Sequence, residues 1–231
     1  MGYSKFRRTK NRANLIAFSI SGTKSKLIYR IKKIIMNVPK IVFRYSWIYD
    51  QNCKEWARIS KKDIKSYPSS RKIVNYIKSV EKMWNKISGK ILHELSKVTS
   101  LKWKSKIIHC YVVGKCVPFS DPLTLPLYEK KDYFIDVLIH ELIHQLFSQN
   151  WKETRKAWKY IQRKYKNESH ETQIHIPLHA VHSHIYMKFF NVERLERDFK
   201  AVSKIPDYRK SWEIVKRKGY EKIMQEFVRR I

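Results

Sequence analysis

Apolar residues recur at helical spacing over long parts of this chain. From Arg71 to about Leu101 they form one continuous stripe. Residues three and four apart share one face of a helix, so this stripe predicts one long core-packed helix, with Gly89 as the point where it bends. The same spacing in the tail, from Val192 to Ile231, predicts two or three amphipathic helices. A shorter basic helix is predicted over residues 27–35, before Pro39.

Other segments are rich in β-branched and aromatic residues and predict strands. Residues 41–49 and 107–113 have this composition. The segment from Pro122 to Tyr128 is extended, because prolines near both ends disfavour a helix, and proline is tolerated on edge strands. These elements predict an α+β fold that is mainly helical, with a small sheet packed on a long helix. They also predict a basic extension over residues 1–50 and a folded domain over residues 51–231.

The segment from Asp132 to about Gln149 predicts a buried helix. Asp132 is a suitable N-terminal cap, and apolar residues then surround the predicted helix on nearly all sides. After Asp136, the only carboxylate in this segment is Glu141, and it lies beside His140. Polar side chains in a buried helix need partners, so these residues are candidates for a functional site.

His140, Glu141 and His144 form an HExxH sequence within this helix. Residues four apart lie on one helical face, so both imidazoles can bind one metal ion. A bound zinc ion lowers the pKa of a water molecule, and the Glu141 carboxylate can accept the proton that this water loses. The spacing therefore predicts one Zn²⁺ ion bound by His140 and His144, with Glu141 as general base.

A second group of histidines supplies candidates for the third metal ligand. His170, His175, His179, His182 and His184 lie within 15 residues of sequence. Pro177 is expected in the first turn of a helix, which would place His175 at its entrance and His179 inside it. Either histidine can complete a tetrahedral site, and Glu168 and Glu171 are carboxylate alternatives. Tyr186, His182 and His170 are candidate donors to a developing oxyanion.

This order of elements resembles the zincin metallopeptidases, and in particular compact gluzincins of the minigluzincin type. The resemblance covers about Arg71–Phe190 and implies zinc, peptide hydrolysis and a peptide substrate held in an extended form along the edge strand around Leu123–Leu127. Gluzincins use a downstream glutamate as third ligand, usually followed by an aspartate four residues later. At that distance this chain has Glu171 followed by His175, or His175 followed by His179, so it departs from the Glu–Asp pattern of the gluzincins.

The positive net charge of the chain suggests a polyanionic partner. The formal net charge is +30, and residues 1–49 contain Lys and Arg but no Asp or Glu. Such a composition allows binding to nucleic acid, although it equally fits a solvated basic surface. Residues 151–165 form a basic segment that contains aromatic residues. A nucleic-acid-associated protein and a catalytically silent metal-binding protein are therefore the alternative functions.

The cysteines and the length of the apolar segments indicate the cellular compartment. There are three cysteines and no CxxC pair, which fits a reducing compartment better than a disulfide framework. No apolar segment approaches the roughly 18 residues needed to cross a membrane. The sequence therefore predicts a cytoplasmic protein without a transmembrane segment.

Overall fold

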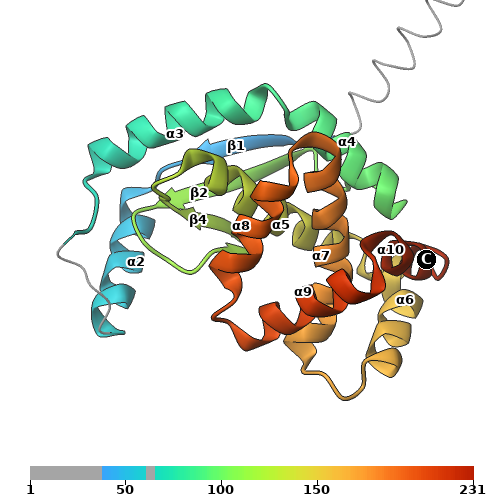
Figure 1. Cartoon of the computed structure of the whole chain (residues 1–231). Coiled ribbons are helices and arrows are strands. Elements are labelled where there is room, and N and C mark those ends of the chain that lie inside the picture. Colours follow the sequence, from blue (N-terminus) through green and yellow to red (C-terminus); the bar gives the residue numbers. More distant parts are fainter. Residues whose placement is uncertain (1–37, 61–65) are drawn as a thin grey trace, which may run out of the picture. The chain divides into compact units, whose positions relative to one another are not determined.

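A computed structural model describes residues 38–60 and 66–231 of the chain (Figure 1). The chain divides into two units, Met1–Val38 and Pro39–Ile231, and every element described below belongs to the second. This unit is mainly helical and contains a small mixed sheet, which confirms the predicted α+β class. The basic helix predicted before Pro39 lies outside the described residues.

The sheet has four strands in the order β1 (Lys40–Arg44), β2 (Ile107–Val113), β4 (Leu123–Pro126) and β3 (Phe119–Ser120). Strands β1, β2 and β4 are parallel, whereas β3 is antiparallel to β4. The predicted edge strand, β4, therefore lies inside the sheet. The prediction was wrong because the two-residue strand β3 folds back onto β4 and takes the edge position.

Strand β1 is shorter than predicted and belongs to the folded unit. It ends at Arg44, and the helix α2 (Trp47–Ile59) follows, with the Ser46 side chain accepting a hydrogen bond from the backbone N–H of Tyr49. The aromatic residues that suggested a longer strand thus lie in a helix, because a serine cap outweighs their strand preference. Since β1 pairs with β2, the folded unit begins before the predicted boundary at residue 50, which falls inside α2.

A buried carboxylate fixes α2 at the end of β2. Asp50 is 1% exposed and accepts hydrogen bonds from the Gly114 backbone N–H at 2.8 Å and from the Tyr67 hydroxyl at 2.6 Å. A Cβ atom on Gly114 would lie 2.4 Å from the Tyr67 ring. Glycine is therefore required at this position because the aromatic ring approaches the backbone closely.

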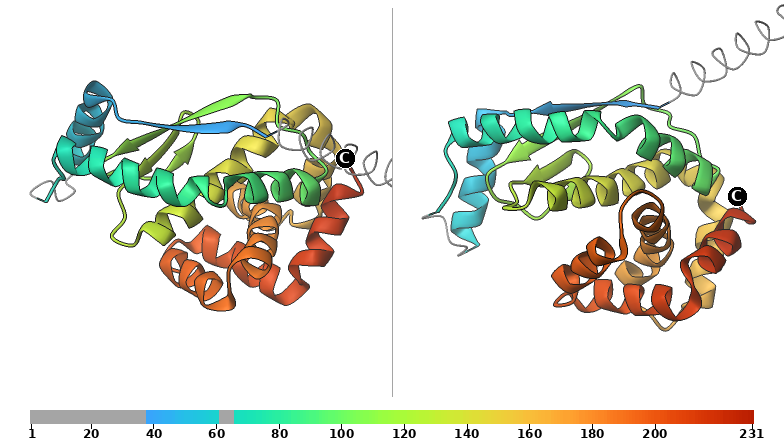
Figure 2. Two further views of the ribbon diagram at one scale, coloured as in Figure 1. Left: turned by 90° about the horizontal axis from the view of Figure 1, so that it is seen from above. Right: turned by 45° about the horizontal axis from the view of Figure 1, so that its top comes forward.

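The long helix predicted from Arg71 is divided in two. Helix α3 (Ser70–Asn85) and helix α4 (Ser88–Thr99) meet at Lys86 and Ile87, just before Gly89. Helix α3 packs on β1 and β2, while α5 (Lys131–Gln149) packs on β4 and β3 (Figure 2). These two helices cover the face of the sheet that carries Ile108 and Cys110, and the opposite face exposes Ile107 and His109.

The second half of the unit is entirely helical. It consists of α6 (Trp151–Lys164), α7 (His170–Phe189), α8 (Val192–Val202), α9 (Pro206–Lys218) and α10 (Tyr220–Val228), which confirms the helices predicted in the tail. Helix α7 contacts α4, α5, α6, α8, α9 and α10 (Figure 1). Its packing against α5 brings the two histidine-bearing segments together.

Two predicted helix starts were wrong. Asp132 does not cap α5, which begins at Lys131; its carboxylate instead lies in the first turn and pairs with Arg197 at 2.6 Å. Pro177 lies inside α7, whose true cap is Ser169, accepting from the backbone N–H of Thr172 at 3.0 Å. A proline inside a helix costs about 3 kcal/mol, and the packing of α7 on its neighbours offsets that cost.

Among the described residues, no helix combines the length and the apolar character that a membrane span requires.

Candidate metal centre

The HExxH segment lies in the middle of α5, the most deeply buried helix on the sheet. His140 and Glu141 are 8% and 6% exposed, while His144, one turn further along, is half-buried. The centroids of the two imidazole rings are 5.1 Å apart. The four-residue spacing therefore places both rings on one side of α5, as the sequence predicted.

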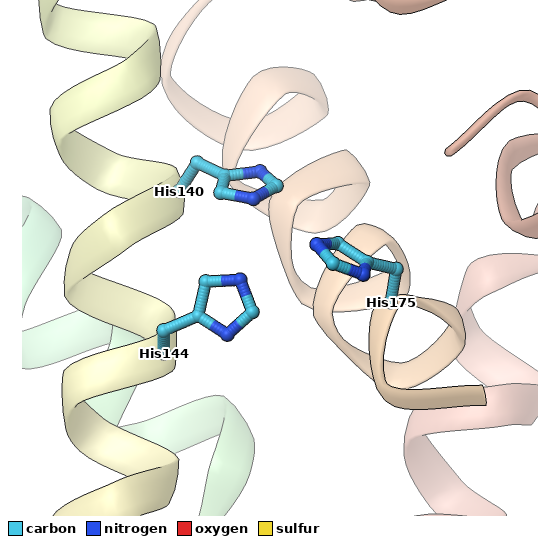
Figure 3. Close-up of side chains that lie close together, drawn as sticks. All are labelled: His140, His144 and His175. Carbon is cyan, nitrogen blue, oxygen red and sulfur yellow. The ribbon is translucent and has the colours of Figure 1, made fainter. Parts of the chain in front are cut away.

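Helix α7 brings the third imidazole to this site. One nitrogen from each of His140, His144 and His175 lies within 4.8 Å of the other two. Figure 3 shows the rings of His140 and His144 extending from α5 toward the ring of His175 on the facing helix. Within the described residues, this is the one cluster of three or more histidine, cysteine or carboxylate side chains with this spacing.

Hydrogen bonding fixes the orientation of the His175 ring. Its Nδ1 atom lies 2.7 Å from the backbone carbonyl oxygen of Glu171, so Nδ1 carries the proton and donates. Its Nε2 atom is buried and has no hydrogen-bond partner in the described part of the chain. A metal-ligating histidine commonly has this arrangement, with one ring nitrogen held by an acceptor and the other presenting its lone pair.

The site has a donor set and spacing that suit a small divalent cation. Tetrahedral zinc with Zn–N bonds near 2.1 Å sets the ligand nitrogens about 3.4 Å apart. The three nitrogens lie within 4.8 Å of one another, so small side-chain rotations would bring them to bonding distance. Three neutral imidazoles would leave a fourth coordination position for water or substrate.

His179, the other predicted third ligand, is held elsewhere. Its Nδ1 atom lies 2.8 Å from the Ser211 hydroxyl, and its ring stacks on Trp212 with a centroid distance of 4.2 Å and an interplanar angle of 11°. Both partners belong to α9. His179 therefore joins α7 to α9, and His175 is the histidine that completes the triad.

The remaining candidates have other positions. Glu171 approaches the Nδ1 side of His175 at 3.8 Å, and Glu168 lies 3.6 Å from Lys210, so neither carboxylate completes the triad. His184 pairs with Glu94 at 2.9 Å, and His170 is exposed.

His182 is buried next to the triad. Its ring centroid is 5.8 Å from that of His140, and its Nδ1 atom is 3.7 Å from Asp198. Tyr186, another predicted oxyanion donor, stacks on His182 at 4.5 Å. His182 therefore lies next to His140, and Tyr186 packs on His182.

Burial keeps the histidines of the site uncharged. It lowers the pKa of His144 to about 3 and that of His140 well below its ordinary value, with neighbouring histidines adding to the effect. Burial also lowers the pKa of His175, while Glu171 and Asp207 oppose this shift. Desolvation disfavours the charged imidazolium form. Neutral rings are the form that binds a metal, so the lone pairs are available near pH 7.

Glu141 has the opposite shift. Burial raises its pKa to about 8, so without a neighbouring cation the carboxyl group is largely protonated at pH 7. A divalent cation beside it would favour the carboxylate form. The ionisation state of Glu141 therefore depends on whether the site holds a metal.

Tyr208 was missed by the sequence analysis. It lies in α9, and its ring centroid is 4.1 Å from that of His175 and 6.0 Å from that of His140. Burial and the charge of Glu141 raise its pKa to about 12, so its hydroxyl stays protonated and can donate a hydrogen bond. Nothing in its local sequence marks it, because its position depends on how α9 packs against α7.

The described geometry shows a triad of His140, His144 and His175 that could hold a metal ion, with Tyr208 packed on His175 and Glu141 next to His140 in the sequence. Comparison with known proteins adds no relative: no protein-family model, no curated protein and no solved structure matches this chain.

Proposed function

We propose that this protein is a zinc-dependent peptidase in which His140, His144 and His175 hold one Zn²⁺ ion and Glu141 is the general base. The observation that supports the proposal most directly is the convergence of three neutral imidazoles from α5 and α7. Nitrogen-only donor sets suit zinc better than the hard cations Mg²⁺ and Ca²⁺, which prefer oxygen. The proposed zincin-like architecture rests on the same helix pair, together with the small sheet beside it.

The chemistry follows from the neighbouring side chains. Zinc, when bound, would supply Lewis-acid activation of water and of the peptide carbonyl group. Glu141 would take the proton from the attacking water and return it to the leaving amine. The Tyr208 hydroxyl would donate a hydrogen bond to the negative charge that develops on the carbonyl oxygen. Its raised pKa supports this role, because only the protonated phenol donates.

The substrate would bind beside β3 rather than β4. Both sides of β4 are occupied, by β2 and β3, so an added strand can pair only with β3 at this edge of the sheet. The Gln145 side chain donates to the Ser120 carbonyl oxygen, which joins β3 to the turn of α5 that carries His144. A peptide placed along β3 by strand addition would therefore run past the proposed zinc site.

The decisive experiment compares zinc content and peptide hydrolysis in the parent and three variants. Glu141→Gln should retain about one zinc per chain and lose hydrolysis by roughly 100-fold or more, because general-base catalysis typically contributes 10²–10⁴-fold. His140→Ala should lose the zinc and the activity together. His109→Ala, at an exposed position on the sheet, is the matched control and should retain both. A parent that binds no zinc, or a Glu141→Gln variant that hydrolyses as fast as the parent, would refute the proposal.

One observation favours a second candidate function, a metal-stabilised protein without hydrolytic activity. The ring of Tyr208 packs at 4.1 Å on His175, so α9 partly covers the triad. Cobalt substitution distinguishes the two functions, because Co²⁺ spectra report coordination number. A spectrum that changes when a small anion such as azide is added would indicate an open position and favour the peptidase. An unchanged spectrum that becomes responsive in Tyr208→Ala would favour the covered, silent site.

A further inference from the structure

Helix α6 has an outer face that is almost entirely cationic. Its inner face, with Thr154, Ala157 and Ile161, is buried in the core. The outer face exposes six cations: Lys152, Arg155, Lys156, Lys159, Arg163 and, just beyond the helix end, Lys166. Within the described part of the chain, none of the six forms a salt bridge, although Lys152 lies over the Trp151 ring at 5.9 Å and Arg163 donates to the backbone carbonyl of Lys159. The only acidic residue in α6, Glu153, pairs with Lys104 at 2.7 Å.

This cationic face borders a groove between α6 and α7. The groove has a volume of about 400 Å³, and its lining includes Trp151, Trp158, Arg155 and Lys159 from α6 and His170 and Gln173 from α7. A second hollow, bounded by Lys159, Gln162, Arg163 and Lys166, continues it along the same helix. Trp151 lies at one end with 59% of its surface exposed. The groove therefore ends at an exposed indole that lies beside a row of solvent-exposed cations.

We propose that this groove binds single-stranded nucleic acid. Cations along a groove can neutralise successive phosphates, and an exposed indole offers a face on which an unpaired base can stack. A 14-residue helix is about 21 Å long, which matches about six nucleotides at about 3.4 Å per nucleotide along one strand. The base must be unpaired to reach Trp151, which favours a single strand over a duplex.

An anionic membrane is a poorer match for the same charges. Interfacial helices bury an apolar face among the lipid chains, whereas the apolar face of α6 is already buried against α5, α7 and α10. Trp151 is the only large apolar side chain of α6 that is exposed. The proposal goes beyond the peptidase function, because the groove side chains His170 and Gln173 are not among the residues of α7 that face the metal site.

The test measures the affinity of the full chain for a labelled 12-nucleotide oligothymidylate by fluorescence anisotropy, from 50 to 300 mM KCl. Trp151→Ala should weaken binding at least about fivefold through lost stacking. The double variant Arg155→Gln/Lys159→Gln should weaken binding and reduce the slope of log K against log salt by about 1.4, because each phosphate contact on a single strand contributes about 0.7. All three side chains lie on the surface, so circular dichroism should show unchanged folding.

The matched control removes the same charge from another surface. Lys216→Gln/Lys218→Gln lies on the exposed side of α9 and should leave the salt slope within about 0.5 of the parent value. An equal loss in this control would show that the net charge, rather than the groove, binds the oligonucleotide, and would overturn the proposal. So would unchanged affinity in Trp151→Ala, or binding to phosphatidylserine vesicles in the absence of oligonucleotide binding.

Discussion

Two histidines on adjacent turns of α7 illustrate how the packing around a ring decides its role, since His175 but not His179 lies in the triad. The Nδ1 atom of His175 is held by the backbone carbonyl of Glu171, which leaves Nε2 directed at the triad. The Nδ1 atom of His179 is held by Ser211, and its ring lies flat on Trp212. Both rings are buried and of the same chemical type. Only the orientation imposed by their partners separates a candidate ligand from a residue that packs two helices together.

This difference predicts unequal effects of the same substitution. His175→Phe should weaken zinc binding by more than about 100-fold, since loss of a ligand should exceed the 10–100-fold typical of its hydrogen-bonded partners. His179→Phe preserves the aromatic contact with Trp212 and should change zinc affinity by less than about tenfold. Competition with a chromogenic chelator measures both affinities. Equal losses in the two variants would contradict the assignment of His175 as the third ligand.

The sequence predicts those parts of the site whose residues are close together along the chain, and it misses those that depend on contacts between distant helices. His140, Glu141 and His144 are related by helical geometry alone, so their spacing was sufficient. The choice between His175 and His179 depends on the rotation of α7 against α5 and on the side chains of α9, which no local pattern contains. Tyr208 reaches the site from still further along the chain and could not be identified.

At the level of elements, an ion-pair network fixes α8 to the first half of α5. Asp136 is fully buried and is bound by Arg194, whose Nε donates at 3.1 Å, and by Arg197, whose Nη2 donates at 2.6 Å. Arg194 also donates to the backbone carbonyl of Asp132 at 3.0 Å. Because Asp136 is one helical turn before His140, the network holds the start of the candidate metal-binding segment in place.

Removal of Arg194 should therefore be costly. Arg194→Ala leaves a buried carboxylate partly uncompensated and should lower the free energy of unfolding by about 3 kcal/mol, measured by urea denaturation. Arg209→Ala is the matched control: its pair with Glu213 is exposed and spans 4.0 Å, so the change should stay within about 0.5 kcal/mol. Adding Asp136→Asn to Arg194→Ala should recover part of the loss. A loss of less than 1 kcal/mol in Arg194→Ala would show that the network contributes little.

Helices with a long pattern of apolar spacing were predicted correctly. The predictions failed where a single residue or a short strand set the boundary of an element. Helix α5 and the tail helices were identified from their apolar spacing. The break between α3 and α4 at Ile87 interrupts a continuous apolar stripe, and Pro177 lies inside a helix that its packing maintains. The order of strands was missed because β3 has only two residues and its pairing with β4 is a tertiary contact.

In the part of the molecule that the structure describes, the histidine-rich interior is uncharged near neutral pH. Burial lowers the pKa values of His140, His144, His175, His179 and His182. In the unfolded chain these groups take up protons below about pH 6.5, whereas in the folded, metal-free protein they stay neutral to much lower pH. The unfolded state therefore binds more protons below pH 6.5, and this contribution to stability falls as the pH falls.

Buried acidic residues have the opposite effect on the pH dependence of stability, but a smaller one. Burial raises the pKa of Asp198 to about 7 and that of Glu141 to about 8, and it also raises the pKa of Asp136. Between about pH 4 and 7 the folded state holds the protons of Asp198 and Glu141 while the unfolded state releases them, so their contribution to stability falls as the pH rises. The four histidines with large downward shifts, His140, His144, His179 and His182, outnumber these two acids and leave a net excess of about two protons on the unfolded state near pH 5–6.

The metal-free protein should consequently lose stability on acidification, by up to about 2–3 kcal/mol per pH unit between pH 6 and 5. Urea unfolding of the chelator-treated chain at several pH values measures the slope. His182→Leu should reduce it by about 1.4 kcal/mol per pH unit, because it removes one proton-binding group that lies outside the triad. Zinc should stabilise the protein at pH 7, because it binds the folded state through these neutral imidazoles. A metal-free protein whose stability is constant or increases from pH 6 to 5 would show that these rings are already charged or solvated, and the metal site would then lack the neutral donors it requires.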